Sequence, residues 1–157
     1  MIWDNKNNDY IFVKKTQRIM TDKQISLVKN SWVDVVAHVS EAGQIFYENF
    51  FALAPETKSL FTGDSKEQQR KLIMAVTLIF TKINRIENIK DEIKYLSKKH
   101  KGYGVKANYF ESFGKAFVKM VGSILTERKM WNAEMQEAWT AIYNAVAQAM
   151  VENMKEA

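Results

Sequence analysis

The chain has a single proline, Pro55, and few glycines, while its apolar residues recur at helical spacing. Sheets and barrels need many tight turns, and such turns are built mainly from proline, glycine and short polar residues. Helices joined by polar loops need far fewer of them. No segment alternates apolar and polar residues in the way of a half-buried strand. We therefore predict an all-α protein.

Capping signals place the helices along this chain. The sequence TDKQ at 21–24 is a capping box that opens the first strong helix. A second helix is expected from Ser40 to just before Pro55, which prevents simple continuation. Ser65 and Gln68 could form another capping box at the start of a long helix. The remaining helices are expected over about 89–100, over about 107–126, and after a cap at Asn132.

Composition limits the class of protein. Hydrophobic residues make up 46% of 157 residues, enough for the core of one domain, which we place at 20–157 after an N-terminal extension at 1–19. The absence of cysteine excludes disulfide scaffolds and thiolate metal sites. The longest apolar run, at 72–80, is far shorter than the roughly 20 residues that cross a bilayer. We expect a soluble, cytoplasmic protein without a membrane span.

The charge balance is basic. The net charge is +5, from 23 basic and 18 acidic residues that are interleaved along the chain. An excess of this kind can mark a nucleic-acid site, although interleaved charges more often form a solvated surface. We favour the solvated surface and expect no nucleic-acid partner.

His100 is the strongest candidate for a functional side chain. Enzyme motifs are scarce, so any chemistry is expected to belong to a bound cofactor. His100 ends an apolar helix face, where one ring nitrogen can bind a metal while the other donates to the carbonyl of Leu96. Iron in a porphyrin is the metal most often held by one such ligand. Read from this helix alone, a surface histidine among lysines remains an alternative.

Two polar residues on other helices strengthen that interpretation. Gln68 opens an otherwise apolar face, and Tyr47 is flanked by phenylalanines. Each has a structural alternative, since Gln68 could be a capping partner and Tyr47 a core aromatic with a satisfied hydroxyl. Together they would supply two hydrogen-bond donors beside an apolar wall, which suits a small polar ligand.

Ordered motifs give the chain a resemblance to a known family. Phe61 after a proline-led bend, QQRKL at 68–72, LSKKH at 96–100 and GYGV at 102–105 resemble bacterial single-domain globins. The closest group is the globins related to the haemoglobin domain of flavohaemoglobins, often called haemin receptors. The likeness extends from about Thr21 to Glu152. It implies a globin fold of about six to eight helices, three over three, around haem b (iron protoporphyrin IX).

The resemblance assigns roles around the haem. His100 would be the proximal ligand of a five-coordinate iron, and Phe61 the aromatic that wedges the porphyrin. Val105 would touch the ring after the proximal helix, and Tyr103 belongs to the same cofactor site.

The resemblance also assigns the distal side. Tyr47 and Gln68 would donate hydrogen bonds to a bound ligand, with Leu72 limiting the space above the iron. Lys71 and Lys99 could reach the haem propionates or equally remain solvated.

Three positions depart from the family pattern. Gln69 stands where relatives often have glycine, which predicts a looser or shifted crossing with the helix that carries Gly43. Phe110 replaces a proximal tyrosine of flavohaemoglobins. Met154 replaces the glutamate that bonds their proximal histidine, and Glu152, two residues away, should face elsewhere. The polar network on the proximal side is therefore expected to be missing.

The resemblance implies reversible binding of oxygen and other diatomic ligands such as NO and CO. Two distal donors predict slow oxygen release. Nitric oxide dioxygenation with a separate reductase remains an alternative, as does a globin-like sensor or interaction domain. We expect an oxygen-binding protein rather than an enzyme, and a monomer or weak homodimer.

Overall fold

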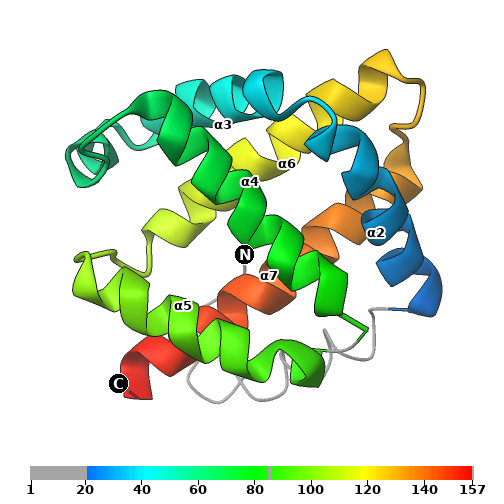
Figure 1. Cartoon of the computed structure of the whole chain (residues 1–157). Helices are drawn as coiled ribbons and strands as arrows, with labels where there is room; N and C mark the ends of the chain where they lie inside the picture. Colours follow the sequence, from blue (N-terminus) through cyan, green and yellow to red (C-terminus); the bar gives the residue numbers. More distant parts are fainter. Residues whose placement is uncertain (1–20, 85, 157) are drawn as a thin grey trace.

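The computed structural model describes residues 21–84 and 86–156, and these residues form helices and connecting loops without a β-strand (Figure 1). The expected extension at 1–19 lies outside the described residues. The elements, in chain order, are α2 (Asp22–Val36), α3 (Val39–Leu53), η1 (Pro55–Leu60), α4 (Ser65–Lys82), η2 (Ile86–Ile89), α5 (Lys90–Gly102), α6 (Tyr109–Glu127) and α7 (Ala133–Glu156). The all-α prediction is confirmed.

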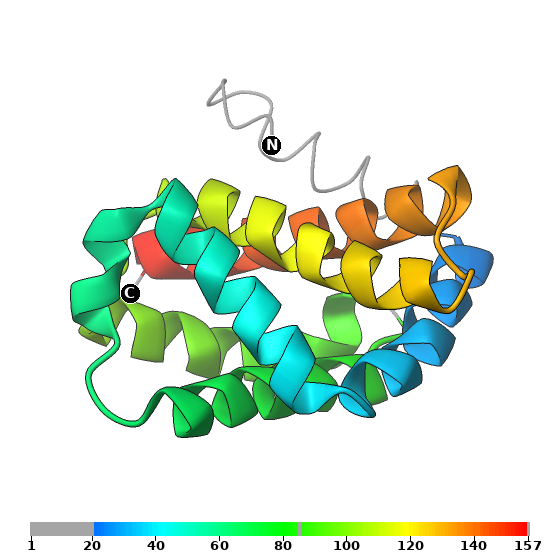
Figure 2. The same cartoon turned by 90° about the horizontal axis from the view of Figure 1, so that it is seen from above.

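The helices pack in two layers of three, with α2, α4 and α5 over α3, α6 and α7. In Figure 1, α4 crosses in front of α6 and α7, and α5 runs along the lower edge. Viewed from above, α6 and α7 lie side by side on the face opposite α4 and α5 (Figure 2). Contacts between α3 and α4, α5 and α7, and α2 and α7 join the layers. Among the described residues, no helix is both long and apolar enough to span a bilayer.

Two of the predicted helix starts are confirmed. Thr21 and Gln24 form the reciprocal capping box of α2, with both bonds at 3.0 Å. Asn132 accepts from the Met135 amide at the start of α7, at 2.8 Å. Each cap satisfies backbone N–H groups that have no partner inside the helix.

The other two starts differ from the prediction. The second helix begins two residues early, with His38 rather than Ser40 at the N-cap. In α4, the cap is Asp64, whose carboxylate accepts from the Lys66 amide at 3.0 Å. Both corrections reflect the same ambiguity, because several neighbouring polar residues can cap one helix start.

An aromatic cluster ties the two layers together. Trp32 packs against Phe80, Phe117 and Trp139, with ring centroids 5.4, 6.1 and 5.8 Å away. These four rings come from α2, α4, α6 and α7. The Trp32 indole N–H donates to Thr77 at 2.8 Å, so this buried polar group keeps a partner. The cluster fixes α4 against α7 at the middle of the molecule.

Gly43 marks the crossing of α3 and α4. A Cβ atom added at Gly43 would lie 2.6 Å from the Cβ of Gln69. The expected consequence of Gln69, a looser crossing, is therefore wrong. The helices approach closely because Gly43 has no side chain, and this is sufficient even though Gln69 on the other helix has one.

Replacing Gly43 by alanine should destabilise the fold by about 1–3 kcal/mol, as overpacking in a well-filled interface does. The measurement is urea unfolding followed by circular dichroism. Gly102 is the matched control, because nothing lies within 4 Å of a Cβ placed there. Gly102→Ala should leave stability unchanged or raise it slightly.

A double-mutant cycle assigns the Gly43→Ala cost to the crossing. The change Gln69→Gly removes the clashing Cβ, so the second substitution should recover part of the loss beyond additivity. Strictly additive effects would show that the strain arises somewhere other than the Gly43–Gln69 contact.

Candidate functional site

An apolar cavity lies between α4 and α5 and reaches into the core. Its volume is about 170 Å³. Nearly all of the side chains around it are aliphatic or aromatic. The described lining residues are Phe50, Thr57, Leu60, Phe61, Leu72, Ala75, Val76, Ile79, Phe80, Leu96, His100, Val105, Tyr109, Phe110, Phe113, Phe117, Ile142, Tyr143, Val146, Ala147 and Met150.

His100 is the one imidazole in this lining, and the helix orients it. Its Nδ1 lies 2.7 Å from the backbone carbonyl oxygen of Leu96, one turn earlier. Since a carbonyl can only accept, Nδ1 must carry the proton and donate. The lone pair is then left on Nε2. The hydrogen bond expected from the sequence is present.

The surroundings of His100 favour the neutral imidazole. Burial lowers the pKa of His100, while its hydrogen bond to Leu96 acts in the opposite direction. A neutral ring with one nitrogen held by the backbone is the form that binds a metal. The described residues contain no group of three histidine, cysteine or acidic side chains that could hold a metal ion.

Three other predicted site residues share this cavity. Phe61 follows η1, Leu72 lies on α4, and Val105 follows α5. All three are half-buried, and together they surround His100 with apolar surface. The structure thus brings together the residues expected to contact a flat apolar ring.

The two expected distal donors lie next to the cavity rather than in its lining. The Tyr47 hydroxyl donates to the backbone carbonyl of Gln68 at 3.3 Å. The Tyr47 ring packs edge-on against Phe61, with centroids 5.3 Å apart, and Phe61 does line the cavity. Tyr47 and Gln68 are therefore close together, although the Gln68 side chain is not brought into the pocket.

The expected haem-edge residues are exposed. Lys71 forms an ion pair with Glu67 at 3.5 Å, and Lys99 lies over the Tyr95 ring. Tyr103 is 64% exposed. None of the three lies in the cavity lining, so the structure leaves them on the surface beside α4 and α5.

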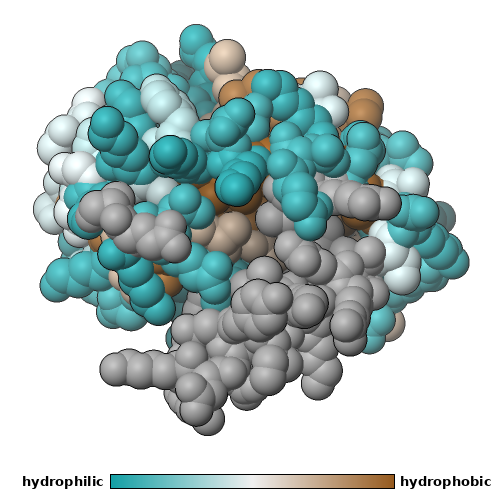
Figure 3. All heavy atoms as spheres, turned by 90° about the horizontal axis from the view of Figure 1, so that it is seen from below, coloured by the Kyte–Doolittle hydropathy of each residue, from teal (hydrophilic) through white to brown (hydrophobic). Residues whose placement is uncertain are grey.

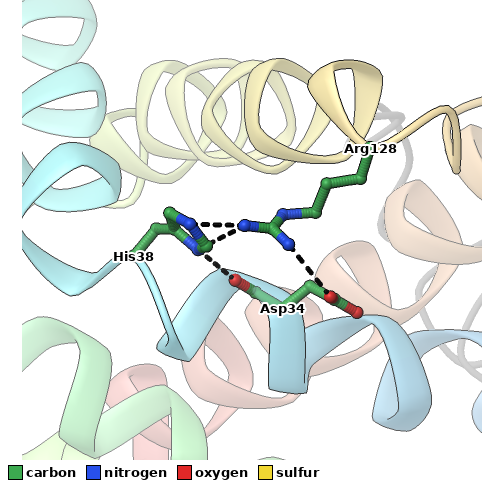
Figure 4. A network of polar contacts seen from close by, with 3 residues as sticks. All are labelled: Asp34, His38 and Arg128. Atoms are coloured by element: carbon green, nitrogen blue, oxygen red, sulfur yellow. Dashed lines mark hydrogen bonds and ion pairs between the residues drawn. The ribbon is translucent and has the colours of Figure 1, made fainter.

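The second histidine, His38, lies away from the cavity at the α2–α3 corner. Its Nδ1 is 2.9 Å from the Asp34 backbone oxygen, and its ring contacts the Arg128 guanidinium (Figure 4). Arg128 also reaches the Asp34 carboxylate at 3.5 Å. Both nitrogens of His38 therefore have partners in a surface network, unlike those of His100.

The three positions that replace or flank the polar residues of flavohaemoglobins make other contacts among the described residues. The Phe110 ring lies 6.2 Å from the His100 ring and can donate no hydrogen bond. Glu152 accepts from Gln148 at 2.8 Å, so its carboxylate serves another contact. Met154 is apolar and packs against the core.

Tyr143 is a half-buried wall of the cavity that the sequence did not single out as a site residue. Its hydroxyl donates to the Phe110 backbone carbonyl at 2.6 Å. Its ring fills the space left by Gly114, where an added Cβ would lie 2.4 Å from Tyr143. Met150 and Phe80 were missed in the same way. Helical spacing indicates that such residues are buried, but not that they border a cavity.

A second hollow, of about 680 Å³, lies along the outer side of α6 and α7. Charged residues such as Glu111, Lys115 and Lys119 line it, and no histidine does. It is larger than the cavity at His100, but its described lining contains no imidazole. The cavity at His100 is therefore the candidate site.

The residues present fit a haem. The cavity offers an apolar surface on several sides and one oriented imidazole, which are the two requirements of a porphyrin held by a single iron ligand.

Comparison with known proteins identifies the family. The Globin family model matches residues 44–150, and the chain belongs to the globin family. An uncharacterised globin-like protein of Aquifex aeolicus is 25% identical over 133 residues, covering 85% of this chain and 93% of that protein. A Gossypium hirsutum protein named as an anaerobic nitrite reductase is 28% identical over 153 residues, covering 88% of this chain and 93% of that protein.

A solved structure shows the same fold. A bacterial globin from Campylobacter jejuni superposes with a TM-score of 0.76 at 23% identity, covering 87% of this chain and 97% of its own. The family and this fold support a haem-binding globin, and the expected globin fold is confirmed.

Burial raises the pKa of Tyr47 to about 12 from its ordinary 10.0. Because the unfolded chain loses this proton first, the stability contributed by neutral Tyr47 is fully present below pH 10 and lost as pH rises towards 12. The Tyr47 phenol should thus remain a donor at pH 10. The measurement is a pH titration of tyrosinate absorbance in the wild type and in Tyr47→Phe. Subtracting the second curve from the first gives the titration of the Tyr47 phenol. A difference curve centred near pH 10 would contradict the buried placement.

Proposed function

We propose that the chain binds haem b through His100 and binds oxygen reversibly at the iron. The observation that carries this proposal is the orientation of His100, whose Nδ1 is held 2.7 Å from the Leu96 carbonyl at the wall of an apolar cavity. Ferrous haem supplies an open coordination position for a diatomic ligand when it is bound. The chain contributes the axial nitrogen, the dry surroundings and the hydrogen-bond donors.

Tyr47 is the first candidate donor to the ligand. Its present bond to the Gln68 carbonyl is long, at 3.3 Å, and therefore weak. A rotation of the hydroxyl could exchange this bond for one to a ligand with partial negative charge. Because Tyr47 is half-buried, the new bond would be weakly screened by water.

Gln68 is the second candidate donor. Its side chain is half-buried at the first turns of α4 and carries an amide N–H₂. A change of rotamer would bring this group over the cavity beside Leu72, one turn later on the same helix. Two such hydrogen-bond donors would favour slow release of bound oxygen over rapid release.

The direct test of this function is reversible oxygenation. The purified protein is loaded with haem, reduced without oxygen, exposed to oxygen and then returned to an oxygen-free atmosphere. The visible spectrum should change on exposure and return to the deoxygenated form. Immediate, irreversible oxidation of the iron with no oxygenated phase would exclude an oxygen-binding role.

Nitric oxide dioxygenation with a separate reductase is the second candidate function. The paired Tyr47 and Gln68 favour it, whereas Phe110 and Met154 lack the proximal hydrogen bonds of flavohaemoglobins. Steady consumption of nitric oxide with a supplied reductase and oxygen would establish catalysis. A single stoichiometric burst would leave oxygen binding as the function.

A further inference from the structure

The net positive charge of this chain is concentrated in one segment. Five lysines and no acidic residue lie at 93–110, around the second half of α5. The other 18 basic residues are matched by the 18 acidic residues elsewhere, so this segment accounts for the net +5. Within this segment, the interleaving of basic and acidic residues is interrupted. We call these residues the α5 lysine surface: Lys94, Lys98, Lys99, Lys101 and Lys106.

All five lysines of the α5 lysine surface are exposed. Among the described residues, no ion pair joins Lys94, Lys98 or Lys106 to an acidic residue. From below, the side on which α5 lies in Figure 1, most of the described surface is hydrophilic (Figure 3). The charges of these three lysines are thus available to a partner.

Helix stability alone does not explain this arrangement. Lysines in the last turn of a helix are favoured by its dipole, and the effect fades within that turn. Lys94 lies a turn further back and Lys106 beyond the helix end, so neither gains from it. Two tyrosines stand among the lysines, Tyr95 at 61% and Tyr103 at 64% exposed. Exposed tyrosines are enriched where proteins dock.

The position of the surface relates it to the iron site. The same helix carries His100, which points into the cavity while the lysines face solvent. We propose that the α5 lysine surface docks a small acidic electron-transfer protein that reduces haem iron held by His100. This inference rests on the proposed function. In the encounter the donor loses one electron and ferric iron becomes ferrous, with no bond formed or broken.

The residue types favour a protein partner over a nucleic acid. The surface has lysines and no arginine, although arginine is the residue that recognises phosphates with a fixed geometry. Lysines act as point charges that speed encounter and set its salt dependence. Electron-transfer complexes are small and short-lived, so steering of this kind suits them.

The test measures binding to an acidic plant-type [2Fe–2S] ferredoxin, labelled and followed by fluorescence anisotropy against the haem-loaded protein. Lys94→Glu/Lys98→Glu is compared with Lys66→Glu/Lys119→Glu, which alters net charge equally at exposed lysines of α4 and α6. At low salt the first variant should bind about tenfold or more weakly, and the control should stay within about twofold. Wild-type binding should weaken steeply as salt rises.

Equal losses in the two variants would overturn the proposal, because they would show attraction by net charge alone. Tighter binding of a short DNA duplex than of ferredoxin, lost in Lys94→Glu/Lys98→Glu, would overturn it in favour of a nucleic-acid site. The Soret spectrum of each protein distinguishes a failure of the proposed function from a failure of the docking proposal. Failure to take up haem contradicts the proposed function, whereas normal haem binding with unchanged docking contradicts the α5 lysine surface alone.

Discussion

His100→Ala should abolish axial coordination of the haem iron by the protein and shift the Soret band. The structure gives the reason, since His100 is the one imidazole in the cavity lining and is held there by the Leu96 carbonyl. Added imidazole should restore much of the wild-type spectrum by occupying the space of the missing ring. Haem transfer to an acceptor apoglobin should also be much faster in the variant.

Two further variants make the His100 experiment specific. His38→Ala removes the other histidine, which lies in the Asp34–Arg128 network, and should leave the Soret band unchanged. Met150 also lines the cavity and has a sulfur atom that could bind iron. Repeating the measurement with Met150→Leu, a volume-conserving change, removes Met150 as a possible iron ligand. An unaltered Soret band in His100→Ala/Met150→Leu would show that His100 does not bind the iron.

Tyr47→Phe should accelerate oxygen dissociation by roughly tenfold, the equivalent of about 1.4 kcal/mol of lost stabilisation. The hydroxyl lies beside the cavity and bonds only weakly to the Gln68 carbonyl, so it can be released to a ligand. Stopped-flow mixing of the oxygenated protein with an oxygen scavenger and carbon monoxide gives the rate.

Tyr143→Phe is the matched control for Tyr47→Phe. Both changes remove one phenol oxygen from a half-buried ring, but the Tyr143 hydroxyl donates to the Phe110 carbonyl at 2.6 Å. The control should lower stability by about 1 kcal/mol and alter oxygen release less than twofold. Similar acceleration in both variants would indicate a general loosening of the pocket, and no change with Tyr47→Phe would show that the hydroxyl points elsewhere.

The fold could be predicted because its signals are local. The capping box at Thr21 and the cap at Asn132 depend on residues three positions apart, and both are present. The sequence does not distinguish the N-cap of α4, because Asp64 and Ser65 are adjacent and the side chain of either can cap a helix. The local sequences of α3 and α4 do not predict how closely these helices approach at Gly43 and Gln69, because that distance depends on tertiary packing.

The candidate site could be predicted in part for the same reason. His100 is fixed by Leu96, one turn away on its own helix, so its orientation follows from the sequence of α5. The far wall comes from α7, and no local pattern distinguishes Tyr143 or Met150 from ordinary core residues. The distal pair depends on the angle between α3 and α4, which leaves Tyr47 bonded to the Gln68 backbone.

The most direct test of the central claim is a crystal structure of the haem-loaded protein with the iron located by anomalous scattering. The account predicts one iron peak within bonding distance of the His100 Nε2, with the porphyrin between α4 and α5 against Phe61, Leu72 and Val105. An iron peak beside another residue, such as His38 or Met150, with the His100 Nε2 unbound, would contradict it.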